Sequence, residues 1–429
     1  MGMIDRKIAP HSLPFQPFSL IKAQSNILSN GIQVHSLCAG SQPIVRLEFV
    51  FKAGSWFENI NGLSHVASKM LTEGTSQMTS KQIADTIALY GAFVEVHQGF
   101  EHVNLTFYLM EKNLSNILPV IVDMLSDTIC PENELENCKT ITIQSLKVNK
   151  EKTQFLASNE FKKALFGFSN PYGRHYEEED IQSVARKDVL NFFQKFIHLG
   201  NMEIFVSGKF EQTRTIKLLD RYLGTNIGLV KSFKNENYPI ENPEPIKVLV
   251  KKEGAVQSSI RYGSHIINRK HSHFIHFLVL NEMLGGFFGS RLMRNIREEK
   301  GYTYGIHSSV HSLLHGSYFV IATDVKIENT RQTLQEIDLE INRFKTELVP
   351  QNELKTVQSY MLGRFMNSIN TPFSLMDKFK VLHFNELEYD YFDRYVNEVQ
   401  NVTPEQIKLL ASKYLNTNQF YRVVVGGQD

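Results

Sequence analysis

The segment SVARKDVLNFFQKFIHLGNMEIFVSG (183–208) decides the fold, because it aligns without a gap with NVTPEQIKLLASKYLNTNQFYRVVVG (401–426). The matched positions are Val184 with Val402, Val189 with Ile407, Lys195 with Lys413, Phe196 with Tyr414, Ile197 with Leu415, Val206 with Val424 and Gly208 with Gly426. Each segment predicts an amphipathic helix, a short polar turn and a β-branched strand. Agreement over three successive elements favours a duplicated domain over chance similarity.

A second pair of segments supports the duplication. PIVRLEFVFKAGS (43–55) and VQSSIRYGS (256–264) are both alternating strands that end in Gly-Ser, and a helical stretch follows each of them. The repeat is about half of the 429-residue chain, which indicates two related domains and not a solenoid of short repeats. The segment 224–247 between them is rich in Asn, Gly, Pro and charge. We therefore predict domains at 1–223 and 248–429, joined by this linker.

Within each half, strands precede helices and a strand closes the half. EHVNLTFYL (101–109) alternates apolar and polar residues, as a half-buried strand does, and EKNLSNILPVIVDMLSD (111–127) has helical spacing. Such blocks favour the α+β class. We expect two homologous domains, each a mainly antiparallel sheet with helices packed on one face.

Composition excludes several kinds of partner. Hydrophobic residues make up 42% of the chain and charged residues 21%, and the formal net charge is +1. The nearly neutral chain therefore has no overall electrostatic field that would favour binding to nucleic acid or to an anionic membrane. The three cysteines show neither zinc-ligand nor redox spacing, and such sparse use suits a reducing compartment. The first residues form no apolar region of the kind that secretory signal peptides contain, so we expect a cytoplasmic protein. The periplasm is the alternative if a signal peptide has been removed from the sequence.

The segment AGSWFENINGLSHVASKMLTEGT (53–75) resembles the zinc-binding helix of pitrilysin- or insulinase-type metallopeptidases. That family carries Gly-x-Ala-His-x-x-Glu-His-Met-x-x-x-Gly-Thr. Two histidines at i and i+4 share one helical face and a tetrahedral Zn²⁺, and the intervening Glu acts as the general base. In this chain His65 takes the first ligand position, Ser68 the base position and Lys69 the second ligand position.

The resemblance implies a third ligand, a Glu, from a later helix that aligns with ENCKTITIQSLKVNK (136–150). The residues there are Gln144 and Ser145. One surviving histidine cannot hold zinc, so we expect no metal in this chain and no peptidase activity from it alone. His65 is then an ordinary polar or partly buried helix residue. HQGFEH (97–102) lacks zinc-ligand spacing and offers no replacement.

The second half keeps a different part of the family's machinery. NEMLGGFFGSRLMRNIREEKGYTYGIHSSV (281–310) resembles the family's C-terminal domain, in which an Arg and a Tyr seven residues later reach the zinc-bearing domain. The matching residues are Arg297 and Tyr304. A guanidinium and a phenol hydroxyl can donate hydrogen bonds to the oxyanion that peptide hydrolysis develops. Gly285 and Gly286 allow a close approach before the helix. PYGR (171–174) also matches the family and is assigned a turn.

This asymmetry leaves three functions open. Some bacterial members of the family divide the site between two subunits, and this chain has the pattern of the subunit without zinc. It would then supply Arg297 and Tyr304 to a zinc-bearing homologous partner and act on peptides. Alternatively, it is a structural or assembly homologue, or an active peptidase with a displaced metal site. Whether the isolated chain forms a homodimer stays open, and the substrate cannot be read from the sequence.

Overall fold

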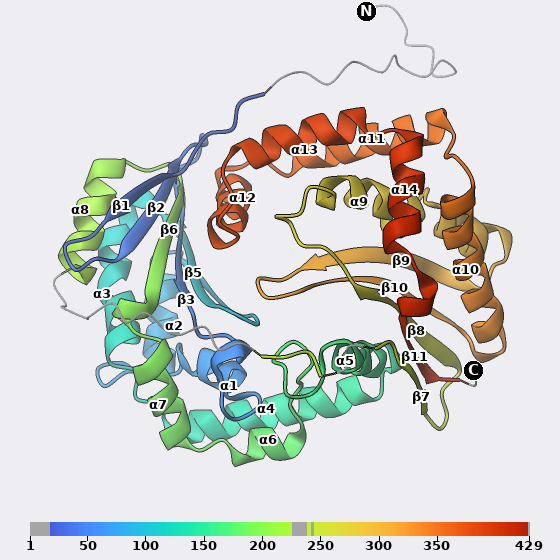
Figure 1. The fold of residues 1–429 in the computed structure, drawn as a ribbon. Coiled ribbons are helices and arrows are strands. Elements are labelled where there is room, and N and C mark those ends of the chain that lie inside the picture. The colour runs from blue at the N-terminus through green and yellow to red at the C-terminus, as the bar shows by residue number, and fades with distance from the viewer. Residues whose placement is uncertain (1–17, 225–237, 242–243, 428–429) are drawn as a thin grey trace, which may run out of the picture.

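The computed structural model describes residues 18–224, 238–241 and 244–427. Two β-sheets, one in each half of the sequence, form the framework (Figure 1). The first has the order β1-β2-β6-β3-β5-β4 and the second β7-β11-β8-β10-β9. The strands are β1 (Gln24–Ile27), β2 (Gln33–Cys38), β3 (Ile44–Phe51), β4 (Phe93–Gln98), β5 (Val103–Met110), β6 (Met202–Gly208), β7 (Lys247–Lys251), β8 (Gln257–His265), β9 (Thr303–Ser312), β10 (Ser317–Lys326) and β11 (Tyr421–Gly426).

The two sheets share one topology, which confirms the predicted duplication. The order β2-β6-β3-β5-β4 corresponds to β7-β11-β8-β10-β9, and in both series the first pair is parallel while the rest are antiparallel. Helices α7 (Arg186–Phe196) and α14 (Pro404–Tyr414) lie at equivalent positions of the aligned segments. The α+β class is therefore confirmed, with β1 as an additional edge strand of the first sheet.

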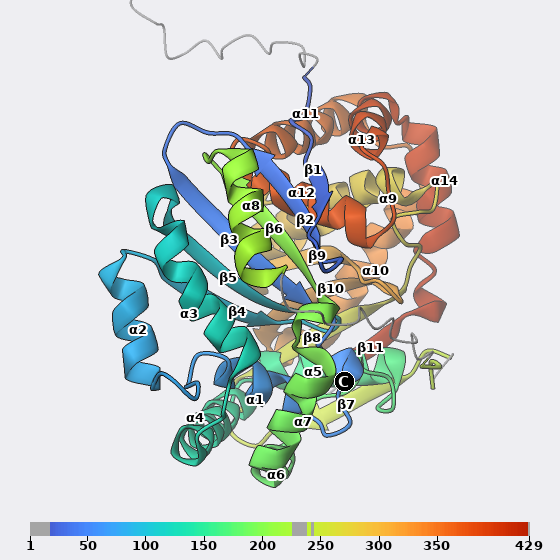
Figure 2. The ribbon, with the colours of Figure 1, turned by 90° about the vertical axis from the view of Figure 1, so that its left-hand side faces the viewer.

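Helices cover the outer face of each sheet. Figure 2 shows α3 and α8 in front of the strands of the first sheet. The remaining helices of the first half are α1 (Leu63–Met70), α2 (Ser80–Leu89), α3 (Leu114–Ser126), α4 (Glu132–Lys150), α5 (Thr153–Phe166), α6 (Glu178–Ser183) and α8 (Gln212–Leu223). Those of the second half are α9 (Phe274–Asn281), α10 (Thr330–Thr346), α11 (Gln351–Asn367), α12 (Pro372–Phe384) and α13 (Asp390–Asn401).

The halves exchange one helix each. Helix α5, from the first half, packs on β8 and β11 of the second sheet, where Phe161 and Leu165 join a buried cluster with Val423. Helix α12, from the second half, packs on β2 and β6 of the first sheet, where Met376 meets Phe205. The inner face of each sheet is thus covered by a helix of the other half (Figure 1).

The exchange explains why β3 is buried on both faces. Its polar residues Arg46 and Glu48 point at α12, where Arg46 pairs with Asp377 at 2.8 Å and Glu48 with Lys380 at 2.7 Å. The sequence predicted alternation, and alternation is present, but the polar face is an internal contact and not a solvent-exposed one. Paired charges can be buried where unpaired ones cannot.

The connection between the halves lies largely outside the described residues. Helix α8 ends at Leu223 and β7 begins at Lys247, and residues 225–237 and 242–243 of the predicted linker 224–247 are not described. In the described part of the chain, no helix combines the length and apolar character needed to cross a membrane.

Candidate functional site

Helix α1 carries the predicted motif positions, and Glu58 fixes the start of this helix. The backbone N–H groups of Gly62 and Ser64 donate to the Glu58 carboxylate at 3.1 and 2.9 Å. The hydroxyl of Ser64 donates to the carbonyl of Ala53 at 2.7 Å. A carboxylate at this end satisfies N–H groups that have no partner within the helix. The position of α1 is therefore fixed by buried polar contacts.

His65 faces a cavity, but its motif partners do not help it to hold a metal. Its ring stacks on Tyr176, with centroids 5.5 Å apart and planes at 29°. Burial, helped by the charge of Lys69, lowers the pKa of His65 to about 4, so the ring is neutral near pH 7. The buried hydroxyl of Ser68 donates back to the His65 carbonyl at 2.8 Å, and Lys69 is exposed. Zinc does not fit these positions.

The structure corrects the third predicted position. Helix α4 packs against α1, yet Ser145 and Gln144 lie on its exposed face. The residue of α4 that lines the cavity beside His65 is Leu146, which is buried. The alignment placed the motif on the right helix but one residue away from the side that faces α1. Since a leucine side chain offers no ligand atom, zinc binding is excluded at this position as well.

The cavity around His65 has a volume of about 450 Å³, and Lys162 and Arg174 are the basic side chains that line it beside the histidines. Burial lowers the pKa of Lys162. Among the described residues, Nε of Arg174 and Nδ1 of His175 are buried without a hydrogen-bond partner. Glu58 is the single carboxyl group of the described lining, and it is engaged at the start of α1. The cavity can therefore receive a hydrogen-bond acceptor, such as a peptide carbonyl or carboxylate, but it offers no free carboxylate to act as the general base.

Arg297, which is half-buried, and Tyr304, which is exposed, lie together in the second half. Arg297 lies in a π-helical turn (Met293–Glu299), Gly301 reverses the chain at φ +65°, and Tyr304 follows at the start of β9. The Arg297 guanidinium lies 4.4 Å from the ring centre of Phe288 and 5.7 Å from that of Tyr304. The structure thus brings the predicted pair together, and it adds Phe288, which the sequence analysis had not singled out.

The predicted close approach of the glycine pair is present at Gly285. Both glycines end a π-helical turn (Glu282–Gly286) that continues α9. A Cβ atom on Gly285 would come within 2.7 Å of the backbone nitrogen of Ser308 in β9, and one on Gly286 within 2.9 Å of the Glu282 carboxyl group. The lack of a side chain at Gly285 thus lets the segment before Arg297 lie close to the strand that carries Tyr304.

The two predicted sites are not joined within one chain. The β9–β10 hairpin meets the first half at its tip. There the His315 ring stacks on Trp56 with centroids 4.2 Å apart, and the backbone N–H of His315 donates to the Tyr172 hydroxyl at 3.0 Å. Tyr304 lies at the other end of β9, eight positions before Ser312, which is about 26 Å along a strand. Figure 1 shows the hairpin reaching toward the first half. PYGR (171–174) forms its predicted turn, and its Tyr172 joins the halves.

Comparison with known proteins gives one family for both halves. Residues 34–175 match the family described as insulinase (peptidase family M16), and residues 183–361 match the family described as the peptidase M16 inactive domain. A Bacillus subtilis relative, "Uncharacterized zinc protease YmxG", is 24% identical over 82% of this chain and 85% of its own length. A Helicobacter pylori relative named "Non-peptidase homolog YmxG" is 20% identical over 90% of both chains.

The fold also matches a solved structure over nearly its whole length. The crystal structure of a peptidase M16 inactive domain from Pseudomonas fluorescens superimposes with a TM-score of 0.85 at 21% identity, covering 95% of this chain and 98% of that one. At such identity the likeness concerns the fold.

Proposed function

The chain belongs to the insulinase family, peptidase family M16, and we propose that it is the substrate-positioning subunit of a two-subunit zinc peptidase. Within the family it is an inactive homologue, as are relatives that match it along most of its length. His65 stands alone at the inverted motif, beside Ser68, Lys69 and Leu146. Zinc and the general base then belong to a homologous partner subunit.

The observation that carries this proposal is that Tyr304 is exposed and Arg297 lacks an ion-pair partner among the described residues. Tyr304 is 94% exposed, and no carboxylate within the described residues lies at ion-pair distance from Arg297. The Arg297 guanidinium nevertheless lies over the rings of both Phe288 and Tyr304, which keeps the two donors side by side. An exposed tyrosine and an unpaired arginine contribute little to the stability of their own fold. Their arrangement suits a ligand that arrives from outside the chain.

The chemistry of these side chains fits the proposed role. A guanidinium and a phenol hydroxyl donate hydrogen bonds to peptide carbonyl oxygens, and more strongly to the charge that develops on them during hydrolysis. Strand β9 is the edge of its sheet, so an extended peptide could add to it through backbone hydrogen bonds. Because Tyr304 lies far from the cavity of its own chain, the site that it completes would belong to the partner.

Two variants test the proposal in the mixed complex. Mixing this chain with a zinc-bearing homologue should give peptide hydrolysis, and Arg297→Ala or Tyr304→Phe should lower kcat roughly tenfold to a thousandfold. Both variants should still assemble, as size-exclusion chromatography would show. Arg294→Ala is the matched control, because Arg294 lies in the same turn but pairs with Glu353 at 3.3 Å. It should leave turnover unchanged.

The same experiment separates the alternatives. Normal turnover with both variants, in a complex that forms, would favour a structural or assembly homologue over a substrate-positioning subunit. Peptidase activity of the isolated chain would favour an active enzyme with a displaced metal site. The remaining partners in the proposal are the peptide substrate and, for isolated protein, a second copy of the chain; nucleic acid and membrane have no part in it. We propose a cytoplasmic location with the periplasm as the alternative; the free thiols of Cys38, Cys130 and Cys138 suit a reducing compartment.

A further inference from the structure

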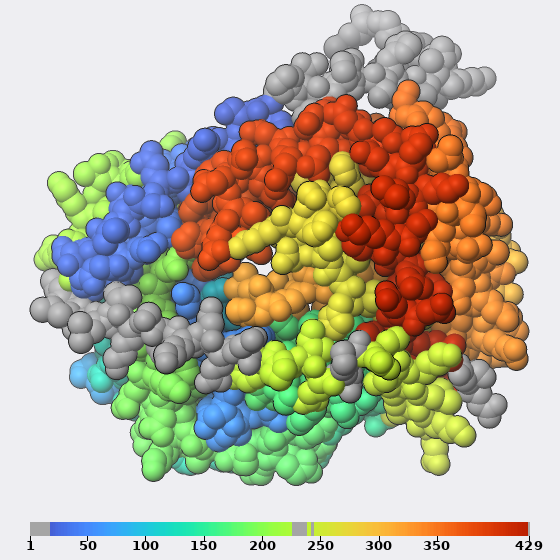
Figure 3. Space-filling view, in the orientation of Figure 1, coloured from blue at the N-terminus to red at the C-terminus, as the bar shows by residue number. Residues whose placement is uncertain are grey.

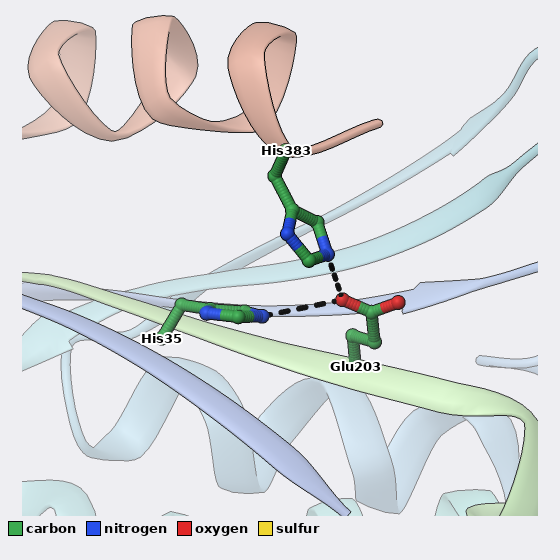
Figure 4. A group of neighbouring side chains, drawn as sticks. All are labelled: His35, Glu203 and His383. Carbon is green, nitrogen blue, oxygen red and sulfur yellow. Dashed lines mark hydrogen bonds and ion pairs between the residues drawn. The ribbon is translucent and has the colours of Figure 1, made fainter. Parts of the chain in front are cut away.

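Three side chains from distant parts of the sequence meet between the two halves. His35 lies on β2, Glu203 on β6 and His383 on α12. Oε2 of Glu203 lies 3.2 Å from Nε2 of His35 and 2.6 Å from Nε2 of His383. Both imidazoles point at this carboxylate, one from the sheet and one from the helix above it (Figure 4). We infer that these residues are the ligands of a zinc-class divalent cation that ties α12 to the first sheet.

The donor set selects the kind of ion. Two imidazole nitrogens and one carboxylate oxygen suit Zn²⁺ and related transition ions such as Co²⁺. Ca²⁺ and Mg²⁺ prefer ligand sets made of oxygen atoms alone. Zinc bound by three protein side chains keeps a fourth position for water or another small ligand.

The distances allow such an ion with small movements. The three ligand atoms all lie within 4.8 Å of one another. Metal–ligand bonds of about 2.0–2.1 Å in a tetrahedral site place ligand atoms roughly 3.3 Å apart. The separation of 3.2 Å between Glu203 and His35 already agrees with this value. The separation between Glu203 and His383 has to widen by about 0.7 Å, and both of these side chains are only partly buried.

The most buried of the three ligands is already oriented. Nδ1 of His35 lies 2.8 Å from the hydroxyl oxygen of Ser25, and its ring stacks on Phe205 with centroids 4.9 Å apart. In the metal-bound form the ring proton would lie on Nδ1, where Ser25 accepts it, and the lone pair of Nε2 would face the ion. A partner on the second ring nitrogen is what fixes a metal-binding histidine in proteins.

The site is accessible from outside. Glu203 and His383 line a cavity of about 360 Å³ together with Lys52, His102 and His315. Figure 3 shows a small opening in the middle of this face, where segments of the second half meet the first half. The cavity therefore gives an ion a path to Glu203 and His383, beside which His35 lies, and leaves room for water at the fourth position.

This site is separate from the degenerate inverted motif, because α1 contributes no ligand to it. The inference does not rest on the proposed function. It does revise the expectation that the chain carries no metal. Without an ion, the Glu203 carboxylate accepts hydrogen bonds from both rings, so the metal-free chain stays folded and metal binding can be measured as an addition to it.

Metal analysis of the full chain tests the site. After removal of metals with a chelator and dialysis against Zn²⁺, the wild type should retain one equivalent, and Glu203→Gln and His383→Ala should lose it. Co²⁺ should give the visible absorption of a tetrahedral ion in the wild type and not in the variants. Zn²⁺ should raise the Tm of the wild type alone by a few degrees, since a ligand that binds only the folded state stabilises it.

Two histidine variants serve as controls. His65→Ala, in the inverted motif, and His271→Ala, at an exposed histidine, should both retain the equivalent of zinc and the Co²⁺ spectrum. A wild type that binds no zinc would overturn the inference, and so would loss of the metal in His65→Ala. Retention of the metal in both Glu203→Gln and His383→Ala would also overturn it. Should His383→Ala fail to fold, the spectrum of Glu203→Gln decides, because that substitution keeps the size of the side chain.

Discussion

Glu58 is a buried carboxyl group whose protonation is coupled to folding. Burial raises its pKa from 4.5 to about 7, although the N–H groups of Ser64 and Gly62 and the charge of Arg174 act in the opposite direction. The folded protein therefore holds this proton more tightly than the unfolded chain does. The resulting stabilisation is complete below the unfolded value of 4.5 and is lost as the pH rises through about 7. The full shift corresponds to ~3 kcal/mol of unfolding free energy.

We expect Glu58→Gln to remove this part of the pH dependence, because glutamine cannot ionise. The free energy of unfolding of the variant, relative to the wild type, should rise between about pH 5 and about pH 8. Chemical denaturation at both pH values measures it. Glu151→Gln is the control, because Glu151 is an exposed residue that pairs with Lys252 at 2.9 Å. Parallel pH profiles for the wild type and Glu58→Gln would contradict the prediction.

At the residue scale, the sequence predicted which residues occupy the motif positions better than it predicted which way their side chains point. The motif alone showed that the general base is lost at Ser68 and the second zinc ligand at Lys69. That Leu146 and not Ser145 faces His65 depends on how α4 rotates against α1, which packing decides. The exposure of Tyr304 likewise depends on which residues pack beside β9.

The positions of other side chains of interest could not be predicted from the sequence. Glu203 is separated from His35 by 168 positions and from His383 by 180, and the three lie on different elements. Arg174 was visible within PYGR, but its place in the cavity lining follows from tertiary structure. Clusters of this kind become visible only once the sheets and the exchanged helices are placed.

At the scale of elements, the repeat extends to the glycines that end its closing strands. Gly208 has φ +128° and Gly426 φ +113°. A Cβ atom would lie 2.1 Å from the carbonyl oxygen of Ile44 at the first position and 2.3 Å from that of Gln257 at the second. These two carbonyls belong to equivalent ends of β3 and β8, so the same constraint applies in both halves.

We expect Gly208→Ala and Gly426→Ala each to lower the free energy of unfolding by roughly 3 kcal/mol or more, because backbone strain and a backbone clash combine. Gly91→Ala and Gly254→Ala are matched controls with φ +61° and +72° and no neighbouring atom within 4 Å. They should cost about 1 kcal/mol. Thermal and chemical denaturation would measure all four variants. Equal losses in both pairs would show that crowding at the strand ends is unimportant.

The order of elements was largely predictable, and their burial was less so. The segments 183–208 and 401–426 gave the closing helix and strand of each half, and 101–109 formed the expected strand β5. The helix expected after Gly285 and Gly286 is present, but most of it, Met293–Glu299, has π-helical hydrogen bonding. Burial of the polar face of β3 could not be predicted, because its cover, α12, comes from the other half.

At the scale of the whole molecule, the exchange of α5 and α12 makes each half depend on the other. Without α12, the first sheet would expose Leu37, Val50 and Phe205 on its inner face. Without α5, the second sheet would expose Val423 and Val425. Contiguous apolar surfaces of this kind drive association or aggregation. Duplication of the sequence therefore does not imply two independently stable domains.

We expect residues 1–223 and 248–429, produced as separate chains, to aggregate when expressed singly and to form a soluble one-to-one complex when co-expressed. Each half would supply the helix that covers the inner sheet face of the other. Light scattering coupled to size-exclusion chromatography gives the stoichiometry, and circular dichroism follows unfolding. The complex should unfold in one transition, because the shared clusters couple the halves. If each half were monomeric and unfolded cooperatively alone, the exchanged helices would be dispensable. A cation bound by His35, Glu203 and His383 would then affect only the docking of α12 and not the stability of either half.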